Sequence, residues 1–406
     1  MSELFLYDDT TARAFEPFAS TRPTSELRAG ALLLRERWER ALGLRASAVV
    51  SAGHLSDFDE SWGTAVARLT SAIPAGSVLA HSRCAVALQP VAAGDSWRCE
   101  NRVAAVMLAR DVEVAELEDG AVSLETLARD GGRTVDIKGR WLERVWDLLA
   151  HLGPMLMEDI PILGVGAART GDAVGLVVGP HSVFAEEGAT IEPHVYFDTA
   201  AGPILLQRGS TVQAFTRLVG PCVIGRDSLV GGDKISGSSI GDVCRVHGEL
   251  AATILLGHAN KAHDGYVGHS YLGRWVNLGA GTITSNLKNT YSTVELWTQD
   301  GEVDTRLQFL GTFFGDHTKT GIGTLLNTGT VVGAGAQIYG GALTPKAIPP
   351  FAWGADPPYS TYRLEKFLDA ARRAMARRHV DLSDRQIRLL TAAYERRWSV
   401  ETTTKR

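Results

Sequence analysis

The chain has 406 residues, of which 45% are hydrophobic and 21% are charged, and its formal net charge is -5. These values are typical of a globular protein with two or three cores, and they argue against a nucleic-acid-binding protein, which would carry a basic surface. No apolar run approaches the roughly 20 residues that span a bilayer, and the acidic N-terminus lacks a signal-peptide pattern. We therefore expect a cytoplasmic protein without membrane contact, whose four cysteines are buried free thiols.

Residues 1–165 alternate short apolar runs with helical patterns. The apolar runs predict buried strands at 4–7, 48–50, 77–80 and 103–109. The spacing over 26–42 predicts a helix that ends at Gly43. This alternation is typical of an α/β, Rossmann-like domain with a mostly parallel sheet, in which ligands bind beyond the carboxyl ends of the strands. We expect the crevice to be lined by Asp8, Asp9, Arg13, Arg22 and Arg28.

The segment Leu6-Tyr-Asp-Asp-Thr-Thr-Ala-Arg13 has the length of a known strand-and-loop signature, L-A-A-G-x-G-T-R. It resembles that of the sugar-1-phosphate nucleotidyltransferases, and 21–30 resembles the P-K-x-L segment that follows it in this family. The resemblance implies nucleotide binding by Arg13, Arg22 and Arg28, and Mg²⁺ held by Asp8 and Asp9 if the domain is active. Two alternatives stay open, because two signature glycines and the lysine are replaced. The domain is a retained scaffold, or the two aspartates cap a helix.

A second helical pattern closes this domain. Trp141, Val145, Leu148 and Leu152 fall at helical spacing over 139–152 and predict a buried stripe. Because Gly153-Pro154 breaks helices, we expect the helix to end there and the domain to end near residue 165.

From 166 to 350 the apolar period changes to six residues. Anchors recur at Val212, Leu218, Ile224 and Val230, and again at Phe314, Thr320, Leu326, Val332 and Ile338. A period of six predicts the hexapeptide repeats of a parallel β-helix, whose coils stack and bury the anchors. Proteins with such repeats, by resemblance, have a left-handed β-helix and are usually homotrimers. Residues 287–313 break the period and predict an inserted hairpin or loop.

The segment 257–286 is the richest in polar side chains. It contains Lys261-Ala-His-Asp-Gly-Tyr266 and Val276-Asn-Leu-Gly-Ala-Gly-Thr-Ile-Thr-Ser-Asn286. Both resemble motifs of the bacterial GlmU-like family, whose members are glucosamine-1-phosphate acetyltransferases and N-acetylglucosamine-1-phosphate uridylyltransferases. Further matches at 315–321 and 327–333 resemble a branch of sugar nucleotidyltransferases with the same two-domain layout.

The resemblance implies a role for each matching residue. It assigns the general base to His263, substrate binding to Lys234, Lys261, Tyr266, Asn277 and Asn286, and acyl-CoA binding to Gly279, Ala280 and Gly281. The chemistry suits these residue types, because acyl transfer to an amine needs a base with a pKa near neutrality and N–H donors for the thioester oxygen. The family's second phosphate-binding cation is missing at 249–252, so the acceptor, an amino-sugar phosphate or a nucleotide sugar, stays open.

Four histidines fall in the same region, at 247, 258, 269 and 317. Zinc is an alternative use for them, although no metal-binding spacing stands out. Residues 351–406 predict two helices, at 361–379 and from Ser383 to about 398, which cap the β-helix; the basic face of the first could instead contact coenzyme A or nucleotide phosphates.

The sequence thus favours an acyl-CoA-dependent transferase that uses acetyl-CoA or another acyl-CoA and acts on a sugar phosphate or nucleotide sugar. One alternative is a nucleotidyltransferase with the β-helix as its oligomerisation module. Another is a non-catalytic scaffold that binds sugar nucleotides.

Overall fold

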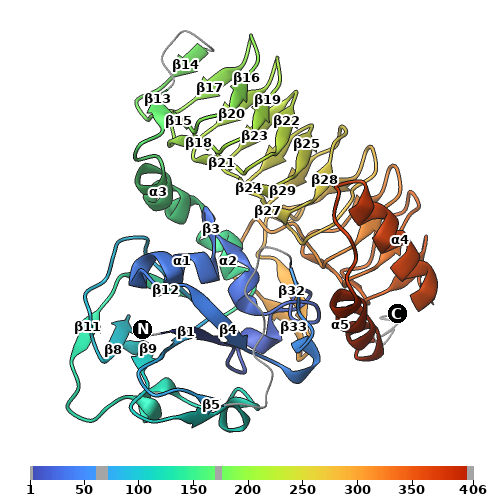
Figure 1. Cartoon of the computed structure of the whole chain (residues 1–406). Helices are drawn as coiled ribbons and strands as arrows, with labels where there is room; N and C mark the ends of the chain where they lie inside the picture. The colour runs from blue at the N-terminus through green and yellow to red at the C-terminus, as the bar shows by residue number, and fades with distance from the viewer. Residues whose placement is uncertain (1–2, 61–71, 170–175, 400–406) are drawn as a thin grey trace. The chain divides into compact units, whose positions relative to one another are not determined.

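The computed structural model describes residues 3–60, 72–169 and 176–399. Its contacts divide the chain into two compact units (Figure 1). The first comprises Met1–Leu148 and Ser383–Ala393, and the second comprises Leu149–Leu382 and Tyr394–Arg406. By these contacts, residues 149–163 group with the second unit and residues 383–393 group with the first. The predicted boundary near 165 and the predicted C-terminal cap remain predictions.

The first unit is built on a six-stranded sheet with the order β11-β8-β9-β6-β1-β4. Its strands are β1 (Leu4–Tyr7), β4 (Ala46–Val50), β6 (Val78–His81), β8 (Ser96–Cys99), β9 (Arg102–Met107) and β11 (Thr134–Asp136). The four predicted strands are confirmed as β1, β4, β6 and β9. The sheet is mixed, because β9 runs antiparallel to both of its neighbours. The carboxyl ends of the parallel strands β1, β4 and β6 lie side by side at one edge.

The prediction of one helix over 26–42 is wrong in its first half. A 3-10 turn, η2 (Thr24–Glu26), is followed by the antiparallel pair β2 (Arg28–Ala29) and β3 (Leu32–Leu33), and the helix α1 covers only Leu34–Leu42. Gly30 between the two strands has φ 63°, a left-handed conformation that turns the chain back and that glycine adopts readily. The predicted stop at Gly43 is confirmed, since Gly43 has φ 67°.

The Gly153-Pro154 pair also acts differently from the prediction. The chain forms β12 (Gly139–Trp141), α2 (Asp147–Ala150) and then α3 (Leu152–Leu163), so the pair begins a helix instead of ending one. Proline is tolerated in a first helical turn, where its missing N–H would have no partner within the helix. The predicted stripe from Trp141 to Leu152 is nevertheless buried.

The second unit is a parallel β-solenoid of stacked coils (Figure 1). Its longest sheet has ten strands: β13 (Ala168–Arg169), β15 (Val183–Ala185), β18 (Ile204–Leu206), β21 (Cys222–Ile224), β24 (Ser239–Asp242), β27 (Ile254–Gly257), β30 (Tyr271–Leu272), β34 (Thr312–Phe314), β37 (Thr330–Val332) and β39 (Ala347–Ile348). The second side has six: β14 (Leu176–Val178), β17 (Tyr196–Asp198), β20 (Arg217–Val219), β23 (Lys234–Ser236), β26 (Leu250–Ala251) and β29 (Val267–Gly268).

The third side begins with β16 (Thr190–Ile191), β19 (Thr211–Val212), β22 (Leu229–Gly231), β25 (Arg245–His247) and β28 (Asn260–Lys261). Single bridges from Asn260 to Asn277 and from Asn277 to Lys319 continue it into β35 (Lys319–Thr320), β38 (Gln337–Ile338), β40 (Ala352–Gly354) and β41 (Ser360–Thr361). A further pair, β31 (Ile283–Thr284) with β36 (Leu325–Leu326), completes the coils after residue 277.

The hexapeptide prediction is confirmed by burial. The anchors from Val212 to Val230 and from Phe314 to Ile338 are buried, and all except Thr320 are apolar members of one continuous core. The predicted insertion contains an antiparallel hairpin of β32 (Glu295–Thr298) and β33 (Gly301–Asp304). The remaining short elements of the chain are β5 (Ala72–Ile73), β7 (Cys84–Val86), β10 (Val112–Glu113) and the 3-10 turns η1 (Ala12–Ala14), η3 (Gly53–Leu55), η4 (Val114–Leu117) and η5 (Leu124–Leu127).

Two helices follow the solenoid, as predicted. In the second unit, α4 (Leu364–Ala376) packs Phe367 edge-on against Phe351, with ring centroids 4.9 Å apart. In α5 (Asp384–Glu395) the predicted capping box forms, since the Ser383 N–H donates to Gln386 Oε1 and the Gln386 N–H donates to Ser383 Oγ. All four cysteines are buried and free, also as predicted. Within the described residues, no helix has the length and apolar character needed to cross a membrane.

Candidate functional site

The candidate site begins at a bulge between β28 and β29. Five residues connect Lys261 to Val267, whereas three connect Val246 to Leu250 in the preceding coil, and these strands are paired in register. The two extra residues have to leave the stacked outline of the coil. His263 and Asp264 are accordingly exposed at the corner. A histidine that projects from a rigid coil is placed to meet a substrate.

Lys261 braces this bulge from inside. Its side chain is 2% exposed, and its ammonium donates hydrogen bonds to the backbone carbonyls of His247 and His263, the first at 2.8 Å. Burial lowers the pKa of Lys261 to about 8, although Asp264 and Asp233 partly offset this shift. The lysine predicted to meet a substrate phosphate is thus already engaged by the loop that carries His263.

The Lys261→Met variant is expected to change how stability depends on pH. The pKa of Lys261 is about 8 in the folded chain and near 10.4 when unfolded, so between these pH values the unfolded chain binds more protons. The free energy of unfolding of the wild type should therefore rise from pH 8 to 10 relative to that of the variant. Denaturant titrations at both pH values check this, and a constant difference between the two proteins would contradict it.

Gly265 fixes the path of the same bulge. Its φ is 126°, and a Cβ atom there would lie 2.3 Å from the Thr282 carbonyl oxygen of the next coil. The Gly281 N–H donates to the Asp264 carbonyl at 2.9 Å and holds the loop against that coil. Only a residue without a side chain allows this approach.

The Gly265→Ala variant is therefore expected to displace the loop and to lower stability by about 1–3 kcal/mol. Gly281→Ala is the matched control, because Gly281 also has positive φ (71°) but its nearest neighbouring atom is 3.6 Å from the added Cβ. Thermal unfolding of both variants checks the prediction. Equal losses would mean that backbone conformation alone, and not the contact with Thr282, explains the effect.

Next to the bulge, Asn286 joins Tyr266 and His269. Its Nδ2 atom lies 2.9 Å from the Tyr266 hydroxyl and 2.8 Å from His269 Nδ1. The His269 ring stacks on Phe309, with centroids 5.3 Å apart. The three polar residues are half-buried, and Phe309 is 43% exposed. Sequence reasoning found Tyr266 and Asn286 but missed His269, which lies 17 residues before Asn286, about one coil.

The hydrogen-bond roles in this cluster follow from its chemistry. The Asn286 amide uses its two protons as donors to the Tyr266 oxygen and to His269 Nδ1. His269 Nδ1 then carries a lone pair, and burial lowers the pKa of this histidine, which favours the neutral ring with its proton on Nε2. Among the described residues, the Tyr266 O–H, the His269 Nε2–H and the Asn286 Oδ1 have no hydrogen-bond partner. Two donors and one acceptor beside an aromatic ring form a set that can bind sugar hydroxyls.

The remaining predicted sugar contacts, Asn277 and Lys234, make no hydrogen bond to this cluster within the described residues. Asn277 Oδ1 accepts a hydrogen bond from Asn260 Nδ2 at 2.8 Å, on the third side of the solenoid. Lys234 forms an ion pair of 3.1 Å with Glu249, the residue that stands near the family's missing cation. Lys234 is therefore partly neutralised, which weakens its predicted role at a phosphate.

Of the three backbone N–H groups predicted to contact acyl-CoA, two are used within the fold. Gly279 donates to Thr320, and Gly281 donates to the Asp264 carbonyl. Ala280 is exposed, and among the described residues its N–H has no hydrogen-bond partner. Only Ala280 thus keeps a free donor for an acyl-CoA carbonyl.

The other histidines of the region separate into different environments. The rings of His258 and His317 lie 4.3 and 6.3 Å from the Trp275 ring between centroids. His247 Nδ1 lies 3.3 Å from Asp264. Within the part of the chain that the structure describes, no group of three potential metal ligands is found. The zinc alternative therefore has no support in their placement.

In the first unit, the two candidate metal ligands have other partners. Asp8 Oδ2 accepts hydrogen bonds from Ser51 Oγ and the Thr24 N–H, and burial raises the pKa of this carboxyl. Both Asp9 carboxylate oxygens lie within 2.9 Å of Arg83 Nε. Asp9 also caps a turn by accepting from the Ala12 N–H, which was the alternative reading of the sequence. In the described conformation Asp8 Oδ2 is used by Ser51 and Thr24 and both Asp9 oxygens face Arg83, so these two carboxyl groups are engaged within the fold.

The three arginines predicted to bind a nucleotide are also engaged. Arg13 donates to the backbone carbonyls of Asp8, Glu118 and Leu117. Arg22 pairs with Glu60 at 2.9 Å, and Arg28 donates to the Ala31 carbonyl. These contacts are structural, so nucleotide binding by the three side chains remains a prediction without geometric support.

Sequence reasoning missed a network of buried residues around His81 and Arg83, at the carboxyl end of β6. Burial lowers the pKa of His81 to about 4, and its ring packs against Trp141 at 5.2 Å. Arg83 joins Asp9 to Glu143, and its guanidinium lies 4.9 Å from the Trp141 ring. No motif signalled this network, because Asp9 and Glu143 lie 74 and 60 residues from Arg83 in the sequence.

Comparison with known proteins agrees with the fold of the first unit. A family model described as "Sugar nucleotidyl transferase" matches residues 4–167. These residues therefore form a nucleotidyltransferase-like domain. The predicted relationship to GlmU-like proteins is also confirmed by curated relatives.

Two of these relatives illustrate the similarity. A bifunctional sugar-1-phosphate nucleotidylyltransferase/acetyltransferase of Sulfurisphaera tokodaii is 33% identical over 95 residues, which cover 23% of this chain and 24% of that protein. A bifunctional protein GlmU of Bartonella quintana is 30% identical over 173 residues, which cover 40% of this chain and 33% of that protein. The chain thus spans a quarter to a third of the length of these relatives.

Two solved structures share only a general likeness. One is a UDP-N-acetylglucosamine acyltransferase from Bacteroides fragilis (14% identity, 50% of this chain and 78% of that chain, TM-score 0.20). The other is an N-acyltransferase from Bacillus cereus in complex with dTDP-4-amino-4,6-dideoxyglucose and coenzyme A (11% identity, 54% of this chain and 96% of that chain, TM-score 0.21). At these TM-scores neither structure supports a conclusion about the function of this chain.

Proposed function

We propose that the chain is a transferase that moves an acyl group from an acyl-CoA to an amino group of a sugar phosphate or nucleotide sugar. The observation that carries this proposal is the Tyr266–His269–Asn286 cluster, which offers hydroxyl-binding groups beside the projecting His263. The bifunctional names of the curated relatives agree with it. A homotrimeric β-solenoid is part of the same proposal.

The proposed step needs one base and one oxyanion donor. The neutral amine nitrogen of the acceptor attacks the thioester carbonyl carbon, a C–N bond forms, and the C–S bond breaks. His263 takes the proton from the amine and returns it to the departing sulfur, so that coenzyme A leaves as the thiol. The free Ala280 N–H is the donor available for the charge that develops on the carbonyl oxygen.

Thiol release from acetyl-CoA, measured with a panel of amino sugars, their 1-phosphates and their nucleotide derivatives, tests the proposal. We expect turnover with at least one phosphorylated acceptor. Absence of thiol release with every acceptor would overturn acyl transfer. Stabilisation by a nucleotide sugar without turnover would then favour the scaffold alternative.

The Asn286→Ala variant tests the acceptor site separately. Without the amide, Tyr266 and His269 lose their common partner, and we expect the KM for the acceptor to rise about tenfold while the KM for the acyl donor is unchanged. Ser285→Ala is a nearby control, because its hydroxyl lies 2.7 Å from that of Thr328 and does not join the cluster. Equal effects on the two KM values would argue against an acceptor site here.

A second candidate, sugar-1-phosphate nucleotidyl transfer, is favoured by the family match of residues 4–167. Pyrophosphate release from a nucleoside triphosphate and a hexose 1-phosphate would support it. The contacts of Asp8 and Asp9 disfavour a metal-dependent form of this reaction in the described conformation.

A further inference from the structure

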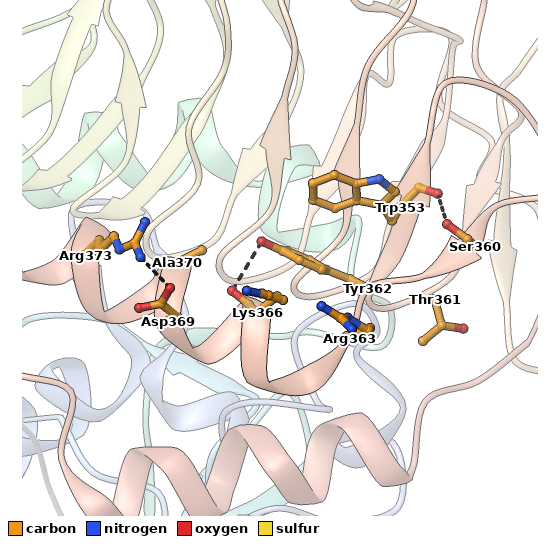
Figure 2. Close-up of a pocket in the computed structure, with 9 residues that line it drawn as sticks. All are labelled: Trp353, Ser360, Thr361, Tyr362, Arg363, Lys366, Asp369, Ala370 and Arg373. Carbon is orange, nitrogen blue, oxygen red and sulfur yellow. Dashed lines mark hydrogen bonds and ion pairs between the residues drawn. The ribbon is translucent and has the colours of Figure 1, made fainter.

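A cavity of about 530 Å³ lies where α4 meets the last strands of the solenoid (Figure 2). Its chemistry-bearing lining consists of Trp353, Tyr362, Arg363, Lys366, Asp369 and Arg373. We propose that this cavity is a binding site for a nucleoside phosphate, with the base on the two aromatic rings and the phosphates on the cations.

The aromatic wall supplies the surface for a base. The rings of Trp353 and Tyr362 lie 4.5 Å apart at an angle of 50°, and Tyr339 packs edge-on against Trp353 at 6.2 Å. The Tyr362 hydroxyl is directed to the Lys366 carbonyl at 3.4 Å, which helps to fix this ring on the first turn of α4 (Figure 2). Aromatic rings of this kind bind nucleobases by stacking, whichever base is present.

The charge balance of the cavity favours an anion. Three cations face one carboxylate, and this carboxylate, Asp369, is paired with Arg373 at 2.6 Å. Within residues 176–399, neither Arg363 nor Lys366 has an ion-pair partner. Arginine and lysine together suit the oxygens of a phosphate, and an aromatic ring beside them selects a phosphate that carries a base.

The position of the cavity connects it to the candidate active site. Asn277, Lys319, Gln337 and Trp353 are register partners on successive strands of the third side. Three strand spacings therefore separate Asn277 from Trp353, about 14 Å. All four residues are half-exposed, whereas Thr320 and Ile338, which follow Lys319 and Gln337, are buried. An extended ligand could follow this outer column from the cavity toward the bulge.

Two sources could supply the nucleoside phosphate. One is the 3′-phosphorylated adenosine diphosphate end of an acyl-CoA, an assignment that rests on the proposed function. The other is a free nucleotide or nucleotide sugar, which would regulate the enzyme or be its acceptor. Adenosine 3′,5′-bisphosphate and UDP serve as probes for the two sources, and inorganic pyrophosphate probes an anion site without a base.

Calorimetric titration of the full chain with the three probes tests the inference. We expect Arg363→Ala with Lys366→Ala to weaken binding of at least one nucleotide by about tenfold or more. Arg372→Ala with Arg377→Ala is the matched control, because both residues are exposed on or next to α4 but do not line the cavity. Thermal unfolding verifies that each variant is folded.

The outcomes separate the sources. Weaker adenosine bisphosphate binding with a higher KM for acyl-CoA identifies the acyl donor, and weaker UDP binding identifies a free nucleotide. Trp353→Leu should weaken nucleotide binding and leave pyrophosphate binding unchanged. The inference is overturned if the Arg363/Lys366 variant binds both nucleotides like the wild type, or if pyrophosphate binds as tightly as the nucleotides. The titration measures nucleotide binding directly. The inference can therefore be confirmed even if the acyl-transfer assay finds no activity.

Discussion

The His263→Ala variant is expected to lower kcat for acyl transfer by about 10²–10⁴-fold, the usual contribution of a general base. Its free energy of unfolding should stay within about 0.5 kcal/mol of the wild type, because the side chain is exposed and the brace from Lys261 reaches the backbone carbonyl of His263. Steady-state thiol release with saturating acyl-CoA and acceptor measures the first quantity. Denaturant titration measures the second.

His247 is a second histidine that could act as the base, so the His247→Ala variant is the control for this experiment. His247 is the nearest alternative, because its Nδ1 atom lies 3.3 Å from a carboxylate oxygen of Asp264, the residue next to His263. We expect His247→Ala to retain kcat within tenfold of the wild type. If His247→Ala removes activity and His263→Ala does not, the base is His247, and the match of His263 to the family motif is misleading.

The β-solenoid was predictable because every coil needs apolar residues at the same inward-facing positions, six residues apart. Val212, Leu218 and Ile224 point into one narrow core, which favours an apolar residue at every sixth position. The two wrong helix predictions, over 26–42 and at Gly153-Pro154, have a different cause. Gly30 and Pro154 act through backbone conformation and position in a turn, and an apolar period does not report either property.

The candidate site was predictable only where one motif contains all partners. Tyr266 and Asn286 were assigned through their resemblance to the family's motifs, whereas His269 joins them through the stacking of coils. Lys261 shows the limit of arguing from residue type. A lysine in a motif suggests a phosphate, but the two extra residues of the bulge place backbone carbonyls around its ammonium group.

The Arg83→Met variant is expected to destabilise the first unit by about 3–5 kcal/mol, the cost of removing one partner from a buried ion pair. Arg83 and Asp9 side chains are 10% and 12% exposed, and both Asp9 oxygens lie within 2.9 Å of Arg83 Nε. Without the guanidinium, Asp9 keeps its charge among buried groups, and Glu143 loses a second contact. Denaturant unfolding of the full chain, followed for the transition of the first unit, measures the loss.

Adding Asp9→Asn should recover most of this loss, because asparagine removes the unpaired charge and its Oδ1 can still accept from the Ala12 N–H. A loss below 1 kcal/mol for Arg83→Met alone would show that water screens the pair.

The double variant, Arg83→Met with Asp9→Asn, also tests the second candidate function, sugar-1-phosphate nucleotidyl transfer. If it is stable and keeps the pyrophosphate release of the wild type, the pair is purely structural; if it is stable and loses that activity, the two residues act in nucleotidyl transfer. An ion pair between Asp9 and Arg83 stabilises the fold whether or not the domain is active, so only the second result would assign the pair to a nucleotide site.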